Sequence, residues 1–269
     1  MILFQRAVII TLNTSYIIRQ IMDSDAIIPI PPNDMPIMIE ICSGSATVSD
    51  EFRQNGYFTI SFDINSKLNK FETDHHILGD IRETLPKFLE QQDHLLHLIE
   101  FIWFSPPCTR YSCMAFQQGH FKNGYAVTPE GQEADMIVRA GLRFCHVVNP
   151  THWILENPRA LLRTRPFMQI EERKTVSYCQ YGHPSMKPTD LFGVFPRSWL
   201  PKMCKNGAPC HIPAPRGSSS GTQGKGSNFS RSIIPRPLVQ SFILAINNDE
   251  QKSLYDFPHG SFLYYGWEV

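Results

Sequence analysis

The chain has 269 residues, 42% of them hydrophobic, which suits one large domain or one domain with a small appendage. Its formal net charge is zero, so the overall balance does not by itself indicate a nucleic-acid partner, and its seven cysteines show no disulfide-type spacing. The apolar stretch at residues 7–12 is too short to span a bilayer. We therefore expect a soluble protein of a reducing compartment, the cytoplasm.

From residue 36 onward, strand-like and helix-like patterns alternate along the chain. Residues 1–35 are poorly patterned and are interpreted as an N-terminal extension. Strands are expected over residues 36–44, 57–65, 75–81, 99–108, 151–158, 174–182 and 187–195. Helices are expected over residues 45–56, 83–98 and 131–148. This alternation predicts an α/β fold with a mostly parallel sheet and helices on both faces.

The remaining segments follow a catalytic core at residues 36–193. We expect a short insert at residues 194–230, a C-terminal helix that returns to the core at 231–248, and an aromatic tail at 249–269. Residues 191–248 contain no Asp or Glu, but they contain the cations Arg197, Lys202, Lys205, Arg216, Lys225, Arg231 and Arg236. A stretch of this kind in a neutral protein favours a surface that faces a polyanion.

Small or polar residues follow several of the expected strands. In open α/β sheets, ligands bind beyond the carboxyl ends of the strands, so these residues are expected to converge. The turn Ser43-Gly44-Ser45 lies between a strand and a helix, and Asp63 ends the next strand about 20 residues later. The turn alone is consistent with an ordinary tight connection, and it lacks the full dinucleotide fingerprint. Turn and acid together favour a nucleotide-type cofactor.

A cysteine and a glutamate also end expected strands. Cys108 follows two prolines, and Glu156 begins the sequence Glu-Asn-Pro. A thiolate and a carboxylic acid at adjacent strand ends form a candidate pair for covalent catalysis. Each residue alone has a simpler explanation: Cys108 as a small buried hydrophobic residue, and Glu156 as the cap of a helix after Pro158.

The ordered set SGS, Asp63, GDI, SPPCTRYS, ENP and QYG resembles the DNA cytosine-5 methyltransferase family, particularly its short bacteriophage-encoded members. The resemblance runs from about residue 37 to about residue 246. It implies a Rossmann-like fold dependent on S-adenosylmethionine and a DNA substrate whose target cytosine is flipped out of the duplex. Cys108 is similar to the nucleophile that adds to cytosine C6, and Glu156 is similar to the acid that contacts the N3 and N4 edge. The methyl group then goes to C5.

The resemblance also implies the cofactor-binding residues. Ser43, Gly44 and Ser45 would line the methionine and ribose side, and Asp63 would hold the ribose hydroxyls. Asp80 and Ile81 would flank the adenine, and Pro106 belongs to the same set. The segment RSIIPRPL resembles the last family motif, which would place Ser232 against the methionine end. A simple amphipathic helix that starts at Pro235 is the alternative for this segment.

The chain departs from the family pattern in two places. The usual Arg-x-Arg after the sixth strand is missing, and Lys187, with Thr189 two residues on, is the cation assigned to that catalytic role. The recognition insert is short, so we expect the recognised DNA sequence to be short, or the selectivity to come partly from a partner.

The insert contains the sequence MCKNGAPCH. Cys204, Cys210 and His211 are candidate zinc ligands, with Cys179 as a possible fourth, although a glycine- and proline-rich turn with incidental thiols explains the pattern equally well. The glycine-rich residues 214–232 suit contacts to phosphates.

Three activities stay open on these grounds. The favoured one is methylation of cytosine C5 in DNA. The others are methylation of RNA or of a free nucleotide, and non-catalytic nucleic-acid binding on a methyltransferase fold. An amino-methylating enzyme is disfavoured, since an aromatic residue normally stands where this chain has Cys108.

Overall fold

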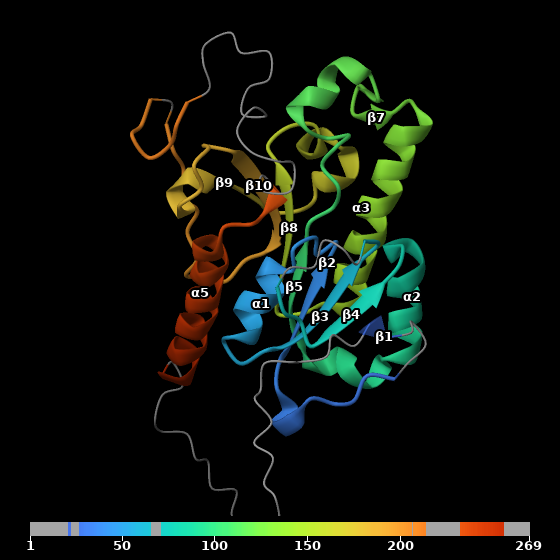
Figure 1. Cartoon of the computed structure of the whole chain (residues 1–269), viewed down its shortest axis with the longest axis vertical. Coiled ribbons are helices and arrows are strands. Elements are labelled where there is room, and N and C mark those ends of the chain that lie inside the picture. Colours follow the sequence, from blue (N-terminus) through green and yellow to red (C-terminus); the bar gives the residue numbers. More distant parts are fainter. Residues whose placement is uncertain (1–20, 23–26, 66–70, 206, 214–231, 256–269) are drawn as a thin grey trace, which may run out of the picture.

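The computed structural model describes residues 21–22, 27–65, 71–205, 207–213 and 232–255 (Figure 1). An eight-stranded sheet in the order β1-β4-β3-β2-β5-β8-β10-β9 forms its centre. The bounds are Ile21–Met22 (β1), Ile37–Ile41 (β2), Phe58–Asp63 (β3), His75–Leu78 (β4), Ile99–Phe104 (β5), His152–Pro158 (β8), Arg173–Ser177 (β9) and Pro188–Val194 (β10). A separate hairpin joins β6 (Phe121–Lys122) to β7 (Tyr125–Ala126).

The helices connect these strands. The α-helices are α1 (Thr47–Arg53), α2 (Ile81–Gln91), α3 (Pro129–Val148) and α5 (Arg236–Tyr255). Short 3-10 helices span Pro32–Asp34 (η1), Asp93–Leu98 (η2), Cys113–Gln118 (η3), Leu162–Thr164 (η4), Pro166–Met168 (η5) and Tyr178–Tyr181 (η6). Among the described helices, none has the length and apolarity that crossing a membrane requires.

Strand direction in the sheet is mostly parallel. Strands β4, β3, β2, β5 and β8 pair in parallel, while β10 runs antiparallel to both β8 and β9. The central strand β2 is buried along its whole length, as expected of a parallel strand covered on both faces. The predicted α/β fold with a mostly parallel sheet is therefore confirmed.

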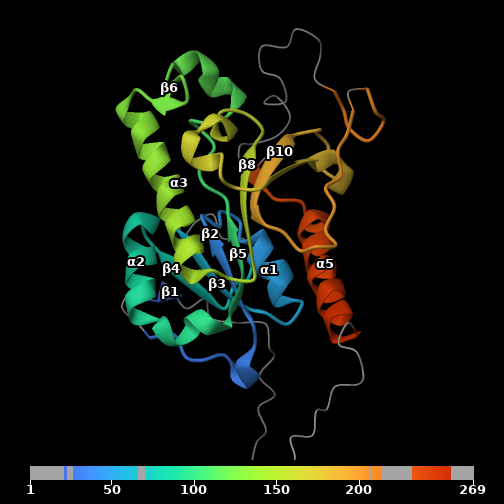
Figure 2. The ribbon, with the colours of Figure 1, turned by 180° about the vertical axis from the view of Figure 1, so that it is seen from behind.

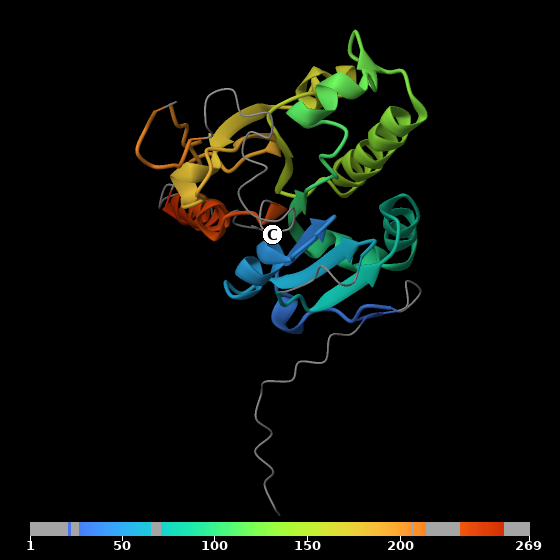
Figure 3. The same ribbon diagram turned by 45° about the horizontal axis from the view of Figure 1, so that its top comes forward.

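Two helix pairs cover the two faces of the sheet (Figures 2 and 3). Helices α2 and α3 lie on one face, where Leu85 and Leu142 pack with Ile39 of β2. Helices α1 and α5 lie on the other, where Phe52 and Phe242 pack with Trp103 of β5. This arrangement leaves the carboxyl ends of β2, β3, β4, β5 and β8 along one edge.

Several segments differ in detail from the sequence-based expectations. Ile28, in the expected extension, is 1% exposed within the core, and its N–H donates to Gln92 Oε1 at 2.9 Å. Strand β9 ends at Ser177, and the expected strand continues as the 3-10 helix η6. Helix α5 extends to Tyr255, beyond the expected end at residue 248.

Candidate active site

The candidate residues follow strands that are neighbours in the sheet. Ser43 and Asp80 come after β2 and β4, Asp63 is the last residue of β3, and Cys108 comes after β5. Glu156 lies near the end of β8, which pairs with β5. The parallel register places all five residues along the same edge of the sheet.

The turn after β2 has an unusual backbone conformation. Cys42, Gly44 and Ala46 all have positive φ angles, of 57°, 51° and 58°. The Gly44 N–H donates to Asp63 Oδ2 at 2.8 Å, and the Asn65 N–H donates to Oδ1 at 2.8 Å. No described heavy atom lies within 4 Å of the position that a Cβ would take on Gly44. The backbone at this turn is therefore accessible to a ligand, and Asp63 holds the turn in place.

Glu40 supports the same turn, although the sequence analysis did not identify it. Its Oε2 accepts a 2.7 Å hydrogen bond from the Ser49 N–H, in the first turn of α1. The N-cap of α1 is Ala46, which offers no side-chain acceptor, so Glu40 replaces the usual capping group. Burial raises the pKa of Glu40 to about 7. An acidic residue inside an apolar strand is the sequence signal that could have revealed it.

Asp80 and Ile81 lie at the start of α2. Asp80 is the N-cap of this helix, and its Oδ1 accepts from the Arg82 N–H at 2.9 Å. Hydrogen bonds from the Arg82 side chain hold the pKa of Asp80 below its ordinary value. Ile81 is 4% exposed in the core beneath the helix start. The carboxylate thus stays ionised at the sheet edge.

Backbone hydrogen bonds fix the loop that carries Cys108. The Ser105 N–H donates to Ile41 O of β2 at 3.0 Å, and Asn157 Nδ2 donates to Pro106 O at 3.2 Å. The Cys108 carbonyl accepts from the N–H groups of Tyr111 at 3.0 Å and Ser112 at 2.9 Å. Cys108 itself is exposed, so it is not a buried hydrophobic residue.

A buried polar network supports this loop from below. The Tyr111 hydroxyl donates to Asp135 Oδ1 of α3 at 2.8 Å. Arg165 Nε donates to the same oxygen at 3.0 Å, and its guanidinium lies 4.4 Å from the centroid of the Phe121 ring. Sequence reasoning quoted Tyr111 only as part of a motif and missed Asp135 and Arg165. Asp135 lies 24 residues from Tyr111 and 30 residues from Arg165 in the sequence, and no local sequence pattern encodes such contacts.

Tyr178, which was also missed, connects the predicted catalytic residues. Its buried hydroxyl donates to Glu156 Oε1 at 2.7 Å, and Lys187 Nζ lies 4.3 Å from the centroid of its ring. Burial raises the pKa of Tyr178 well above its ordinary value, and the charges of Glu156 and Cys108 raise it further. The phenol therefore stays protonated as a donor to Glu156. Cys108 follows β5, which pairs in parallel with β8, so its loop and Glu156 lie at the ends of adjacent strands.

Glu156 does not cap a helix, which was the simpler explanation for it. The next helix, η4, has Leu161 at its N-cap and no side-chain capping hydrogen bond. Lys187 precedes β10, the strand that pairs with β8, and it has a positive φ of 33°. Glu156 and Lys187 thus both contact Tyr178.

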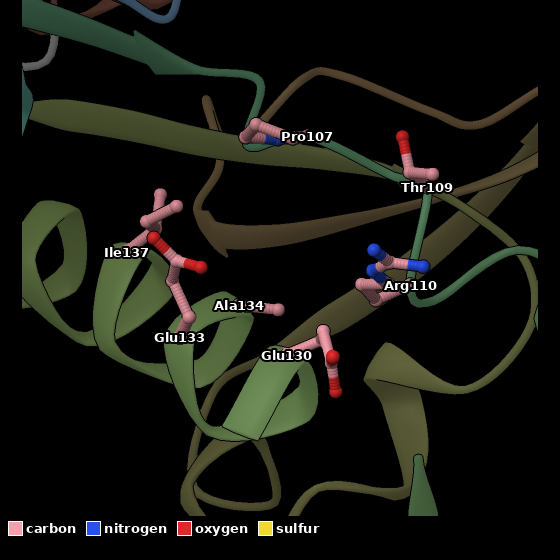
Figure 4. Close-up of a pocket in the computed structure, with 7 residues that line it drawn as sticks. All are labelled: Pro107, Thr109, Arg110, Glu130, Glu133, Ala134 and Ile137. Carbon is pink, nitrogen blue, oxygen red and sulfur yellow. The ribbon is translucent and has the colours of Figure 1, made fainter. Parts of the chain in front are cut away.

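A pocket of about 250 Å³ lies between the Cys108 loop and α3. Figure 4 shows its lining residues, with Pro107, Thr109 and Arg110 on the loop opposite Glu130, Glu133, Ala134 and Ile137 on α3. Glu133 forms a 3.6 Å ion pair with Arg82 of α2. The pocket therefore reaches from the Cys108 loop toward the helix that Asp80 caps.

The C-terminal segment docks against α1. Ser232 is exposed and precedes α5. Arg236 Nη1 pairs with Glu51 Oε2 at 2.6 Å, its Nη2 pairs with Asp50, and Gln240 Nε2 donates to Glu51 Oε1 at 2.7 Å. Ser232 thus lies four residues before Arg236, which contacts α1, the helix after the Ser43–Ser45 turn.

The cations and thiols of the insert lie partly within the described residues. Lys202 and Lys205 are exposed, whereas Arg216, Lys225 and Arg231 fall outside the described part of the chain. The ligand atoms of Cys179, Cys204, Cys210 and His211 all lie within 4.8 Å of one another. The three predicted metal ligands and the possible fourth are therefore close together.

Comparison with known proteins gives structural neighbours and no sequence relatives. No protein-family model matches the chain. No curated protein matches it either. Among solved structures, the methyltransferase EhMeth of Entamoeba histolytica aligns with 64% of this chain and 57% of its own, at 16% identity and a TM-score of 0.42.

Two further neighbours are also methyltransferases. The Dnmt2 methyltransferase of S. pombe aligns with 59% of this chain and 48% of its own, at 15% identity and a TM-score of 0.39. The tRNA (uracil-54, C5)-methyltransferase of Pyrococcus abyssi, in complex with S-adenosyl-L-homocysteine, aligns with 63% of this chain and 35% of its own. The identity is 10% and the TM-score is 0.31. This chain spans about half the length of the first two.

The sheet topology carries the fold assignment. Strands β3 and β4 lie on one side of β2, and the chain then crosses over so that β5 and β8 lie on the other side. The antiparallel strand β10 lies between β8 and the last strand of the sheet, β9. The chain therefore has the Rossmann-like fold of S-adenosylmethionine-dependent methyltransferases.

Proposed function

We propose that this chain is a methyltransferase that transfers a methyl group from S-adenosylmethionine to C5 of cytosine in DNA, through a covalent bond between Cys108 and C6. One observation carries the proposal. An exposed cysteine follows β5 on a loop held by hydrogen bonds, and the neighbouring strand β8 carries the buried Glu156–Tyr178 pair at the same sheet edge as the Gly44–Asp63 turn.

The turn after β2 suits the cofactor. S-adenosylmethionine, when bound, supplies an electrophilic methyl group on sulfur. Ser43, Gly44 and Ser45 would face its methionine and ribose, because the Gly44 backbone is accessible and its conformation is held by Asp63. A carboxylate offers about four lone-pair positions, so Asp63 keeps acceptor capacity for ribose hydroxyls after its two hydrogen bonds.

The remaining cofactor residues follow the same edge of the sheet. Asp80 and Ile81, at the start of α2, would flank the adenine, together with Pro106 and the adjoining pocket. Ser232 would approach the methionine end from the segment that docks on α1.

Cys108 and Glu156 would act on the base. The Cys108 thiolate forms a bond to C6, and the electron pair of the C5–C6 double bond makes C5 nucleophilic. Glu156 contacts the N3 and N4 edge and favours this addition, and Tyr178 holds one oxygen of its carboxyl group. C5 then bonds to the methyl carbon, whose bond to the cofactor sulfur breaks with the pair left on sulfur. Loss of the C5 proton restores the double bond and expels the thiolate.

The charge distribution favours a polymeric substrate. Residues 191–248 contain seven cations and no acid. This charge suits the many phosphates of a nucleic-acid backbone better than it suits a single free nucleotide. A base stacked in a duplex cannot reach Cys108, so the target must be flipped out. Lys187, half-buried beside Tyr178, would contact the base and the Cys108 loop.

Transfer assays with labelled S-adenosylmethionine test the proposal. Purified chain is incubated with DNA, RNA or dCTP, and the label is located on the base. We expect 5-methylcytosine in DNA. Label in RNA or in dCTP alone would assign a different substrate, and no transfer to any of the three would support a purely binding role.

Substitution of the nucleophile tests the covalent step. Cys108→Ser should abolish transfer and leave cofactor affinity within about twofold, because Cys108 is not in the turn after β2. Cys113→Ser, at the next exposed thiol of the loop region, is the matched control and should retain activity. DNA that contains 5-fluorocytosine should form an adduct with wild type and with Cys113→Ser only. Normal transfer by Cys108→Ser would overturn the mechanism.

A further inference from the structure

Three thiols and an imidazole meet outside the candidate active site. Cys179 belongs to η6, whereas Cys204, Cys210 and His211 come from the insert that follows β10. Cys204 Sγ lies 3.2 Å from Cys210 Sγ and 3.5 Å from His211 Nδ1. Cys210 Sγ lies 3.6 Å from both Cys179 Sγ and His211 Nδ1.

These separations fit one tetrahedral ion. Zinc binds thiolate at about 2.3 Å and imidazole nitrogen at about 2.0–2.1 Å, so a tetrahedral site has edges of about 3.6–3.8 Å. Three of these four separations lie within about 0.2 Å of that range, the Cys204–Cys210 separation of 3.2 Å is shorter, and all the ligand atoms lie within 4.8 Å of one another. A disulfide between Cys204 and Cys210 would require about 2.05 Å, far shorter than the 3.2 Å observed.

The surrounding backbone supports the four side chains. Gly207, with φ of 84°, turns the chain between Cys204 and Cys210, so both thiols face the same point. The Cys204 N–H donates to Ser177 Oγ at 3.0 Å, and Gln180 Nε2 donates to Cys210 Sγ at 3.1 Å. A hydrogen bond to a ligand sulfur from a neighbouring amide is typical of metal sites.

We propose that Cys179, Cys204, Cys210 and His211 bind one zinc ion, which fastens the insert to η6. Three thiolates and one imidazole complete a tetrahedral shell and leave no position for water, as in structural zinc sites. Binding releases the three thiol protons. Hydrogen bonds of 3.0 Å from Ser177 N to Lys202 O and from Ile212 N to Pro184 O join the same segments.

The ion would also stiffen one wall of the candidate active site. Cys179 directly follows Tyr178, whose hydroxyl donates to Glu156 at 2.7 Å. His211 stands at the start of the segment that leads to the cations Arg216 and Lys225. This consequence rests on the proposed function, whereas the metal site itself does not.

Metal content is the decisive measurement. Untagged chain, purified without chelator, should contain about one zinc per chain by elemental analysis. The cobalt-substituted chain should show the visible absorption of tetrahedral cobalt together with thiolate-to-cobalt charge-transfer bands. Cys204→Ser and His211→Ala should lose at least about tenfold in zinc affinity. Cys113→Ser, which removes an exposed thiol elsewhere, should keep full zinc content.

A rescue variant separates a ligand from a residue needed for folding. His211→Cys offers a fourth thiolate and should bind zinc again, while His211→Ala should not. Metal-free wild type, a Cys204–Cys210 disulfide found by mass spectrometry, or full zinc content in His211→Ala would each overturn the proposal. None of these results depends on methyl transfer. The zinc proposal can therefore be refuted while the proposed function holds, and the proposed function can be refuted while the zinc proposal holds.

Discussion

Replacement of Tyr178 by Phe tests whether the Glu156–Tyr178 pair works as a unit. The change removes one hydroxyl, which is fully buried and donates to Glu156 Oε1 at 2.7 Å. A hydrogen bond to a carboxylate contributes about 1.5–3 kcal/mol, and each 1.4 kcal/mol is a factor of about ten. If the bond positions Glu156 for its contact with the base, kcat should therefore fall by about ten- to a hundredfold.

Stability and cofactor binding distinguish this role from a general structural one. The Tyr178 hydroxyl donates to Glu156 and not to the turn after β2, so the Kd for S-adenosylmethionine should stay within about twofold of wild type. Tyr181→Phe is the matched control, because the hydroxyl of this buried tyrosine accepts from the Lys202 N–H at 3.2 Å instead of donating to Glu156. Tyr181→Phe should lower Tm by a similar amount and leave kcat nearly unchanged.

A double-mutant cycle completes the test. Tyr178→Phe is measured in single turnovers in wild type and in Glu156→Ala, which removes the acceptor. In the Glu156→Ala background the tyrosine change should cost less than about twofold in rate, because the bond no longer exists. An equal cost in both backgrounds would refute the inference that Tyr178 acts through Glu156.

Two further predictions concern charge. The pKa of Glu40 is raised from 4.5 to about 7 by burial, so its contribution to stability is fully present below about pH 4.5 and is lost as the pH rises through about 7. Relative to wild type, Glu40→Gln should therefore gain about 3 kcal/mol in the free energy of unfolding between pH 4.5 and 8, measured in urea; a pH-independent difference would contradict this. Replacing Arg216 and Lys225 by Ala should reduce the slope of log DNA affinity against log salt concentration by about 1.8, or about 0.9 per phosphate contact. It should weaken binding to all DNA sequences alike. Identical slopes would show that this segment does not contact phosphates.

The sheet and the position of the candidate site followed from local sequence. Contiguous apolar runs such as residues 99–104 indicate strands buried on both faces, and intervening helical periodicity implies parallel crossovers. Parallel strands put their carboxyl ends on one edge, so Cys108 and Glu156 were expected at the same edge, and the pairing of β5 with β8 makes their strands neighbours. The resemblance added roles to positions that the alternation had already placed.

Only the tertiary structure decided which side chains contact these residues. Tyr178 pairs with Glu156 across 22 residues, Asp135 with Arg165 across 30, and Cys179 with Cys210 across 31. Such pairs depend on how separate segments pack, whereas periodicity reports only which side of its own element a residue faces. The same reason explains Ile28, which lies in the segment interpreted as an N-terminal extension: only the packing of the surrounding chain placed it in the core.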